Sequence, residues 1–360
     1  MYKSLGAFVA AAFVSTASVA AELHIYNWSD YIAEDTVAKF EAETGIKVSY
    51  DVYDSNEVLE AKLLAGRSGY DLVFPTARPF ADRHIKAGIY AKLDKSKLTN
   101  LGNLEQGIVK SLSDIDADNA HLVPYMWGTT GIGYNVDKVK AILGDVPVDT
   151  WKLVFDPETV KKLSACGVSL MDDATEVFVA ARAYKGLDTA NFDKDAVQQA
   201  ADTVTAVRPH IKYFHSSQYI NDLANGDICV AHGYSGDMLQ ARDRAAEAKN
   251  GVNIAYAVPS EGAVVWTDVM AVPADAKNVA EVHKFIDYML RPEVVAAATN
   301  FVSYANANAK ADALVDPAIV KDPGIYPTAA TREKLLVLKT PSDKQARDMN
   351  RAWTRVKTGK

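Results

Sequence analysis

The sequence has little cysteine, no clustered histidine and no excess of basic residues. It contains 39 Lys and Arg against 46 Asp and Glu, a formal net charge of −7, and the two signs are interspersed along the chain. Proteins that bind nucleic acid present a basic face, so this class is excluded. The seven histidines are scattered, and no H-E-x-x-H or Cys/His cluster occurs. The sequence therefore predicts no metal site.

Motifs of nucleotide binding and of catalysis are also absent. Gly131 and Gly133 lack the rest of a phosphate-binding fingerprint, and we predict no cofactor. Residues 232–237 resemble a nucleophile elbow, but Asp237 stands where its last glycine belongs. We therefore predict no catalytic residues and no enzyme activity. The alternative is a secreted hydrolase that uses the carboxylates of Glu176 and Asp237.

One apolar run stands out, and it lies at the start of the chain. Lys3 precedes the apolar stretch 5–14, and small residues follow it up to Ala21. This order is typical of a secretory signal peptide, and a buried N-terminal helix is the alternative. The run is too short for a stable membrane span. We expect residues 1–21 to be a signal peptide, cut after Ala20 or Ala21, and the mature protein to lie outside the cytoplasm.

The two cysteines are Cys166 and Cys229. In an oxidising compartment an even pair suggests a disulfide, and two separate buried thiols are the alternative. A bond between them would close a long loop, which the chain-entropy model converts to roughly 4 kcal/mol of stabilisation.

Strands alternate with helices along the mature chain. We expect strands at residues 23–28, 46–53, 71–74, 228–231 and 264–272, and helices at 34–44, after Ser55 or Asn56, and after Ser216 or Ser217. Such alternation predicts an α/β fold with a parallel sheet that helices cover on both faces. The length allows two domains, and the glycine- and threonine-rich stretch 124–135 suggests a crossing between them.

Aromatic and acidic side chains gather at the ends of the predicted strands. Ligands of open α/β sheets bind outside the carboxyl ends of the strands, so these side chains are candidates for a site. They are Trp28, Ser29, Asp30 and Tyr31 after the first strand, Thr76 and Arg78 after the third, Tyr234 and Asp237 after strand 228–231, and Trp266 and Asp268 inside strand 264–272.

Several of these residues have a simpler alternative role. Ser29, Asp30 and Asp237 also suit the N-caps of helices. Asp268 lies in an apolar strand, where an unpaired carboxylate is costly to bury, so it either pairs internally or faces a cleft. Arg78 would repel a cation, and we expect it to pair with a cleft carboxylate or to point outward.

Together these side chains suit an alkyl ammonium. A carboxylate favours the charged form of an amine, whose pKa is about 10.4 when it resembles lysine. An aromatic face adds ~0.5–2 kcal/mol of cation–π attraction and covers the methylene groups. The site is therefore predicted to bind a small organic cation.

Four segments of the chain resemble the periplasmic putrescine/spermidine-binding proteins of polyamine ABC transporters. They are residues 23–32, 127–135, 213–223 and 304–307. The resemblance extends over essentially the whole mature chain. It implies a type II periplasmic-binding-protein fold, in which two α/β lobes, each with a mixed, mostly parallel sheet flanked by helices, hold the ligand in the cleft between them. The corresponding lobes are residues 22–126 with 250–309, and residues 127–249 with 310–360.

The resemblance also implies a set of ligand residues. They fall on Trp28, Ser29, Asp30, Tyr31, Thr76, Glu176, Tyr234, Asp237, Trp266, Asp268 and Tyr304. Cys166 and Cys229 fall where putrescine-binding members carry their disulfide. By this reading Asp237 and Asp268 hold one terminal ammonium, and Asp30 and Glu176 serve the other.

Four positions depart from the putrescine-type pattern. At the position of Arg78 those members typically carry serine, and at the position of Tyr234 they carry tryptophan. They carry phenylalanine at the position of Trp266 and a small neutral residue at the position of Asp173. The added carboxylate and the larger ring resemble the spermidine type, and Asp173 would serve a third amine. Arg78 fits neither pattern. We expect a polyamine, with spermidine slightly favoured over putrescine.

The resemblance implies a role in transport. The protein would be the periplasmic ligand-binding component of a polyamine uptake system, a monomer whose partner is an inner-membrane ABC permease. The alternative ligand on the same fold is another amine, such as agmatine, or an amino acid.

Overall fold

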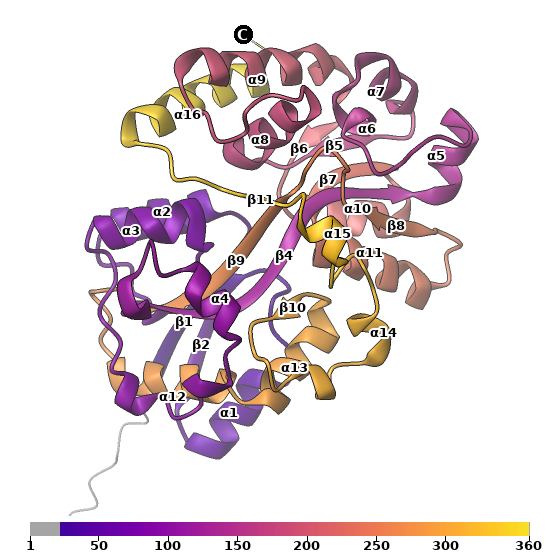
Figure 1. Cartoon of the computed structure of the whole chain (residues 1–360). Coiled ribbons are helices and arrows are strands. Elements are labelled where there is room, and N and C mark those ends of the chain that lie inside the picture. The colour runs from indigo at the N-terminus through magenta and orange to yellow at the C-terminus, as the bar shows by residue number, and fades with distance from the viewer. Residues whose placement is uncertain (1–21, 360) are drawn as a thin grey trace, which may run out of the picture.

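The computed structural model describes residues 22–359, and these form two lobes joined by the long strands β4 (Leu122–Asn135) and β9 (Val264–Ala271) (Figure 1). The predicted signal peptide lies outside the described residues. Among residues 22–359, no helix is long and apolar enough to cross a membrane.

The sheet of the first lobe is centred on β1 (Glu22–Trp28), where Leu23 and Ile25 are fully buried. Alternating burial is the pattern of a strand that packs one face on a core. β1 pairs in parallel with β2 (Lys47–Tyr53) and β3 (Leu72–Val73). β9 runs antiparallel to both β3 and β4. The sheet is therefore mixed.

Helices α1 (Thr36–Thr44) and α2 (Asn56–Leu64) connect these parallel strands. α1 begins two residues later than predicted, and Gly45 ends it with a left-handed φ of 71°. The predicted cap of α2 is confirmed, because the Ser55 hydroxyl accepts a hydrogen bond from the Val58 amide at 3.3 Å.

β4 belongs to both lobes. Its residues 122–129 pair with β9, and its residues 130–135 pair with β7 (Val230–Tyr234) and β8 (Ile254–Ala257). The glycine-rich sequence has a steric reason, since a Cβ atom at Gly128 would lie 2.7 Å from Cζ2 of Trp266. β4 thus changes its pairing partners within the stretch predicted as the crossing, while the crossing and the lobe bounds stay predictions.

The second lobe completes its sheet with β5 (Val168–Leu170), which pairs in parallel with β7 and with β6 (Tyr213–Phe214). Its helices include α8 (Ala174–Tyr184), α9 (Lys194–Val207), α10 (Tyr219–Asn225), α11 (Ser235–Ala248) and the C-terminal α16 (Asp343–Thr358), which Figure 1 shows beside α8 and α9. The remaining regular elements are α3 (Asp82–Lys86), α4 (Gln106–Ser111), α5 (Val136–Leu143), α6 (Lys152–Phe155), α7 (Pro157–Leu163), α12 (Val279–Met289), α13 (Pro292–Val302), β10 (Ala305–Asn306), α14 (Pro317–Val320), α15 (Ala329–Arg332) and β11 (Leu336–Val337).

One predicted helix cap is wrong. The N-cap of α10 is Gln218, and its side chain makes no capping bond. The amides of Ser217 and Gln218 instead donate to Nδ1 of His215, at 3.1 Å and 3.0 Å. The imidazole of His215 therefore accepts the hydrogen bonds from these amides, in place of the predicted caps Ser216 or Ser217.

The predicted disulfide is confirmed. Cys166 and Cys229 are bonded, and their Cα atoms lie 5.5 Å apart. The bond joins the segment before β5 to the residue that precedes β7.

Candidate functional site

A small cavity lies where the two lobes meet. Nine of the twelve ligand residues predicted from the sequence line this cavity: Trp28, Ser29, Tyr31, Thr76, Tyr234, Asp237, Trp266, Asp268 and Tyr304. They come together because β1 and β7 end here, and because β9 passes beside them.

Asp268 is one of two buried carboxylates in the wall. Its Oδ1 accepts a hydrogen bond from the Thr76 hydroxyl at 2.7 Å, and its Oδ2 accepts one from the Tyr31 hydroxyl at 2.9 Å. Burial raises the pKa of Asp268 to about 7, although both hydrogen bonds oppose this shift. Asn56 orients Thr76 through two hydrogen bonds of 2.9 Å and 3.1 Å.

Asp237 is the second buried carboxylate. It lies in the first turn of α11, where the Tyr219 and Tyr304 hydroxyls each donate to it at 2.6 Å. Burial raises its pKa to about 6, against the effect of both hydrogen bonds. Tyr234 is the N-cap of α11, so the alternative role of Asp237 as the cap is wrong.

Both carboxylates share an unusual environment. Among residues 22–359, no Lys, Arg or His side chain forms an ion pair with Asp237 or Asp268. A buried carboxylate without a cation is costly. The cavity is therefore chemically suited to a buried positive group, which favours the ionised form of both carboxyls.

Aromatic rings form the rest of the wall. The ring of Tyr234 lies 6.1 Å from Trp28 and 5.5 Å from Trp266, with both pairs close to perpendicular. The ring centroid of Tyr304 lies 5.2 Å from that of Tyr31 and 5.4 Å from that of Trp266. The Trp28 indole N–H donates to the Phe74 carbonyl at 2.7 Å, which fixes the ring. Such faces attract cations and cover methylene groups.

Comparison with known proteins gives the family. Residues 35–328 match the sequence pattern of the bacterial extracellular solute-binding proteins. The chain belongs to this family. It is 54% identical to the putrescine-binding periplasmic protein PotF of Escherichia coli (strain K12), over 99% of this chain and 98% of the relative. It is 51% identical to the putrescine-binding periplasmic protein SpuD of Pseudomonas aeruginosa (strain UCBPP-PA14), with the same coverage.

A solved structure gives the same result for the fold. The spermidine/putrescine ABC transporter substrate-binding protein PotD of Streptococcus pneumoniae superimposes with a TM-score of 0.74 at 26% identity, covering 94% of this chain and 99% of that chain. The type II periplasmic-binding-protein fold predicted from the sequence is confirmed. Because these relatives are binding components of transporters, this member of the solute-binding family is not an enzyme.

Three predicted ligand residues of this solute-binding protein do not line the cavity. Asp30 has a left-handed φ of 53° and a partly exposed carboxylate, which pairs with Arg244 at 3.1 Å. It does not cap α1, whose N-cap is Asp35, and neither does Ser29. The role of Asp30 in ligand binding stays a prediction.

Asp173 and Glu176 are the other two predicted ligand residues that do not line the cavity. Asp173 caps α8, where its Oδ1 accepts hydrogen bonds from the amides of Thr175 and Glu176 at 2.8 Å and 3.0 Å. Glu176 is 4% exposed, and burial raises its pKa well above the usual value. Burial is the main cause that raises the pKa of the Tyr234 phenol, and the negative charges of Asp173 and Glu176 raise it further.

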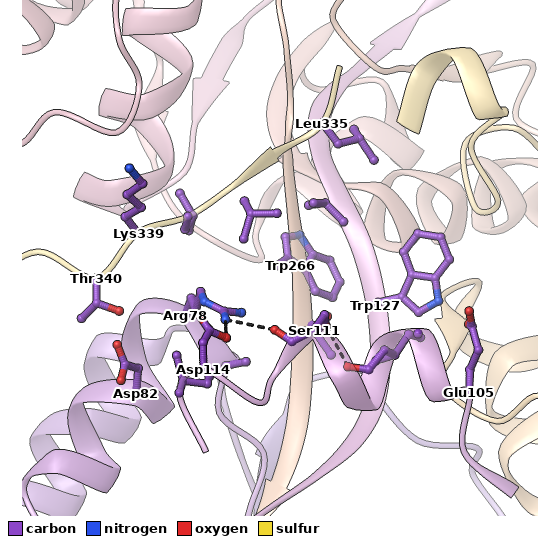
Figure 2. Close-up of a pocket in the computed structure, with 18 of the residues that line it drawn as sticks. Arg78, Asp82, Glu105, Ser111, Asp114, Trp127, Trp266, Leu335, Lys339 and Thr340 are labelled. Atoms are coloured by element: carbon purple, nitrogen blue, oxygen red, sulfur yellow. Dashed lines mark hydrogen bonds and ion pairs between the residues drawn. The ribbon is translucent and has the colours of Figure 1, made fainter. Parts of the chain in front are cut away.

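Arg78 points away from the cavity. Its guanidinium pairs with the exposed carboxylate of Asp114 and donates to the Ser111 carbonyl at 3.0 Å. These residues line a separate groove, in which Figure 2 shows Arg78 and Asp114 below Trp266. Arg78 therefore pairs with a carboxylate outside the cavity, and the expected alternative of a pair with a cleft carboxylate is wrong.

The sequence reasoning missed Tyr219. This residue is fully buried in α10, and its hydroxyl both donates to Asp237 and accepts from the Tyr234 amide at 3.3 Å. It lies in the segment that carries the family resemblance, but a tyrosine inside a helix gives no signal of this contact. Tyr53, Asp54, Ser216, Ser217 and Ile220 also line the cavity without having been predicted.

Proposed function

We propose that this protein is the periplasmic ligand-binding component of an ABC uptake transporter for polyamines. The observation that carries the proposal is the pair Asp237 and Asp268, two buried carboxylates that only hydroxyl groups contact in a ring-lined cavity. An alkyl ammonium supplies the missing positive charge, and its methylene groups pack on the rings.

The size of a diamine sets the expected affinity. A ligand of about six heavy atoms gains at most roughly 9 kcal/mol at the ligand-efficiency ceiling, which corresponds to a Kd somewhat below a micromolar. Tight binding therefore depends on a desolvated cavity whose hydroxyl and carboxylate groups are already oriented. The hydrogen bonds of Tyr31, Thr76, Tyr219 and Tyr304 supply this orientation.

We assign the contacts as follows. Asp237 and Asp268 hold one terminal ammonium, and Ser29 and Thr76 contribute polar contacts. The second ammonium lies toward Tyr234 and Glu176. Asp30 acts only through water, because it lies outside the cavity and pairs with Arg244.

Two observations bear on the ligand's length. The relatives at 54% and 51% identity are both named for putrescine, which favours a diamine. Asp173 and Trp266 favour a longer polyamine. We propose putrescine as a ligand.

Ligand binding also accounts for transport. A ligand that touches both lobes stabilises the closed state, since only that state makes both sets of contacts. The proposed partner, an inner-membrane permease, recognises this closed shape. Export follows from the predicted signal peptide at residues 1–21, and the protein acts as a monomer.

A thermal-shift screen tests the proposal. Putrescine, cadaverine, spermidine and agmatine are compared with amino acids at equal concentration. We expect stabilisation by the amines alone, since an amino acid's carboxylate needs a cationic partner and Arg78 is paired with Asp114 outside the cavity. Stabilisation by amino acids but by no amine would refute the proposed function.

A further inference from the structure

A groove lies on the opposite side of β9 from the ligand cavity. Successive side chains of a strand point to opposite faces of the sheet, so Val265 and Thr267 line the groove, whereas Asp268 lines the cavity. Trp266 borders both the groove and the cavity. Figure 2 shows β4 and β9 running behind the residues of the groove. These two strands therefore separate the groove from the ligand cavity.

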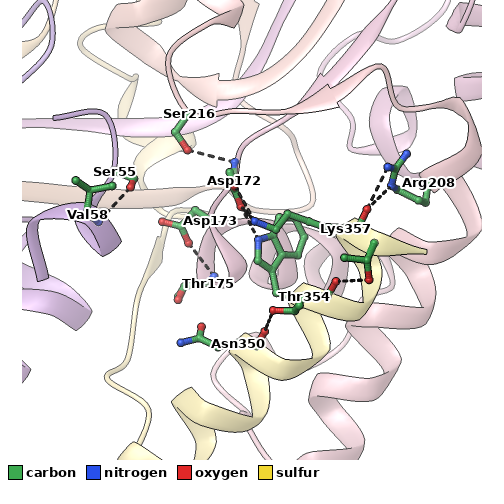
Figure 3. Close-up of polar contacts among 12 residues, drawn as sticks. Ser55, Val58, Asp172, Asp173, Thr175, Arg208, Ser216, Asn350, Thr354 and Lys357 are labelled. Carbon is green, nitrogen blue, oxygen red and sulfur yellow. Dashed lines mark hydrogen bonds and ion pairs between the residues drawn. The ribbon is translucent and has the colours of Figure 1, made fainter. Parts of the chain in front are cut away.

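The two facing walls of the groove belong to different lobes. The first-lobe wall consists of lining residues from segment 77–115, and the second-lobe wall of lining residues from segment 332–340, which contains β11. Segment 332–340 leads into α16, whose Lys357 donates from Nζ to the Asp172 carboxylate at 2.7 Å and 2.8 Å (Figure 3). Arg208 donates to the Lys357 carbonyl at 3.1 Å and 3.2 Å. The second-lobe wall is therefore attached to the second lobe through α16.

The lobes are in contact on the cavity side and apart on the groove side. Beside the cavity, the Tyr304 hydroxyl of the first lobe donates to Asp237 of α11 at 2.6 Å. Arg244 of α11 pairs with Asp30 of the first lobe at 3.1 Å. Among residues 22–359, no hydrogen bond or ion pair joins the first-lobe wall to the second-lobe wall. Because β4 and β9 lie between the cavity and the groove, a motion that parts the lobes at the cavity brings the two walls together.

The first-lobe wall carries an acidic side chain without a partner. Glu105 immediately precedes α4 and is exposed, and its carboxylate forms no ion pair within the described residues 22–359. The remaining charged side chains of this wall form two ion pairs, Arg78 with Asp114 and Lys86 with Asp82. The Asp114 side chain is 70% exposed in its pair, which leaves room for a second cation. The first-lobe wall is thus negatively charged.

The second-lobe wall carries two cations that form no ion pair in the part of the chain that the structure describes. The guanidinium of Arg332 lies over the Trp127 ring, 5.5 Å from its centroid, and Lys339 is exposed. Figure 2 shows Lys339 and Asp114 at one end of the groove, and Glu105 at the other end with Trp127. Each end of the groove thus has a cation on one wall and a carboxylate on the other.

We infer that this groove is an electrostatic latch that favours the open form of the protein. When the lobes part at the cavity, Arg332 pairs with Glu105, and Lys339 pairs with Asp114. The ligand holds the lobes closed and therefore competes with the latch, so these side chains lower the affinity for a ligand that they do not touch. The effect on affinity rests on the proposed function, whereas the effect on the ligand-free protein does not.

The test compares wild type with the double variant Arg332→Gln/Lys339→Gln, which removes both cations. One exposed ion pair shifts an equilibrium by up to about fivefold, so losing two should favour the closed form by roughly 2- to 25-fold. Small-angle X-ray scattering of the ligand-free mature protein should show the variant to be more compact than wild type. Calorimetric titration with putrescine should show a Kd that is lower by up to the same factor.

Two further variants separate the latch from other effects of charge. Lys194→Gln removes an exposed positive charge from the second lobe outside the groove, so it controls for the attraction of a cationic ligand and should alter neither result. Glu105→Gln should favour the closed form as Arg332→Gln does. Combining Glu105→Gln with Arg332→Gln should add little, because both changes remove the same ion pair.

The inference is overturned if the ligand-free double variant is no more compact than wild type, or if its Kd for putrescine is no lower than that of Lys194→Gln. Full additivity of Glu105→Gln and Arg332→Gln would overturn it as well. If wild type binds no amine, the proposed function fails, while the scattering comparison of the ligand-free proteins still decides whether the latch exists.

Discussion

Replacing Asp268 with Asn should weaken polyamine binding and stabilise the ligand-free protein. Asp268 is 4% exposed and accepts hydrogen bonds only from the neutral hydroxyls of Tyr31 and Thr76. A hydrogen bond to a charged group contributes about 1.5–3 kcal/mol, so losing the charge should weaken putrescine binding at pH 8 by roughly 10- to 150-fold.

The expected gain in stability follows from the pKa of the same group. Burial raises the pKa of Asp268 from 3.8 to about 7 in the folded protein. Its contribution to stability is therefore complete below pH 3.8 and is lost as the pH rises through about 7. At about pH 8 the ionised form costs roughly 4 kcal/mol. Asn removes this cost but cannot accept both hydrogen bonds, so we expect a gain of about 1–3 kcal/mol.

Urea unfolding and calorimetric titration measure the two effects. The gain in the free energy of unfolding should appear at pH 8 and vanish at about pH 4, where Asp268 is protonated in the wild type. Asp145→Asn, which changes a carboxylate that is 85% exposed, serves as the control and should alter neither quantity. A loss of affinity below tenfold, together with no gain in stability at pH 8, would refute the reasoning.

Three further predictions concern the cavity and the disulfide. Putrescine affinity should fall as the pH is lowered through about 7 and about 6, because protons compete with the ammonium for Asp268 and Asp237. Calorimetry in different buffers should detect proton release on binding. An affinity that does not change between about pH 5 and 8 would contradict this prediction. Tyr219→Phe should weaken binding roughly 3- to 10-fold by removing one donor to Asp237, and an unchanged Kd would show that Tyr304 alone suffices. Replacing Cys166 and Cys229 by Ser should lower the free energy of unfolding by roughly 4 kcal/mol with little effect on Kd, whereas a large loss of affinity would mean that the bond shapes the cavity.

The parts of the fold that local sequence determines were predictable. Alternating apolar residues gave β1, and Ser55 gave the start of α2 within one residue. The glycines near Gly128 indicated where the chain crosses between lobes. The cap of α10 was not predictable in this way, because the imidazole of His215 competes with the serines for the same amides.

The site residues that lie at or near the ends of strands were predictable. Asp268 and Asp237 were found because each stands at an unusual place beside an apolar strand. The ion pair of Asp30 with Arg244 could not be predicted, because Arg244 is distant in the sequence and no local pattern reveals the pair. Tyr219 was missed for the same reason, since its contact with Asp237 exists only after α10 packs against α11.

The continuity of β4 has a consequence for how the lobes move. β4 pairs with β9 at Gly128, opposite Trp266, and changes partners at Thr130, opposite Tyr234. We therefore expect the rotation axis between the lobes to pass beside the cavity. Residues near this axis move little when the lobes rotate, and residues far from it move over a longer distance. We expect Trp266 to remain in place in the open form and to receive the ligand first, whereas residues at the rim arrive last.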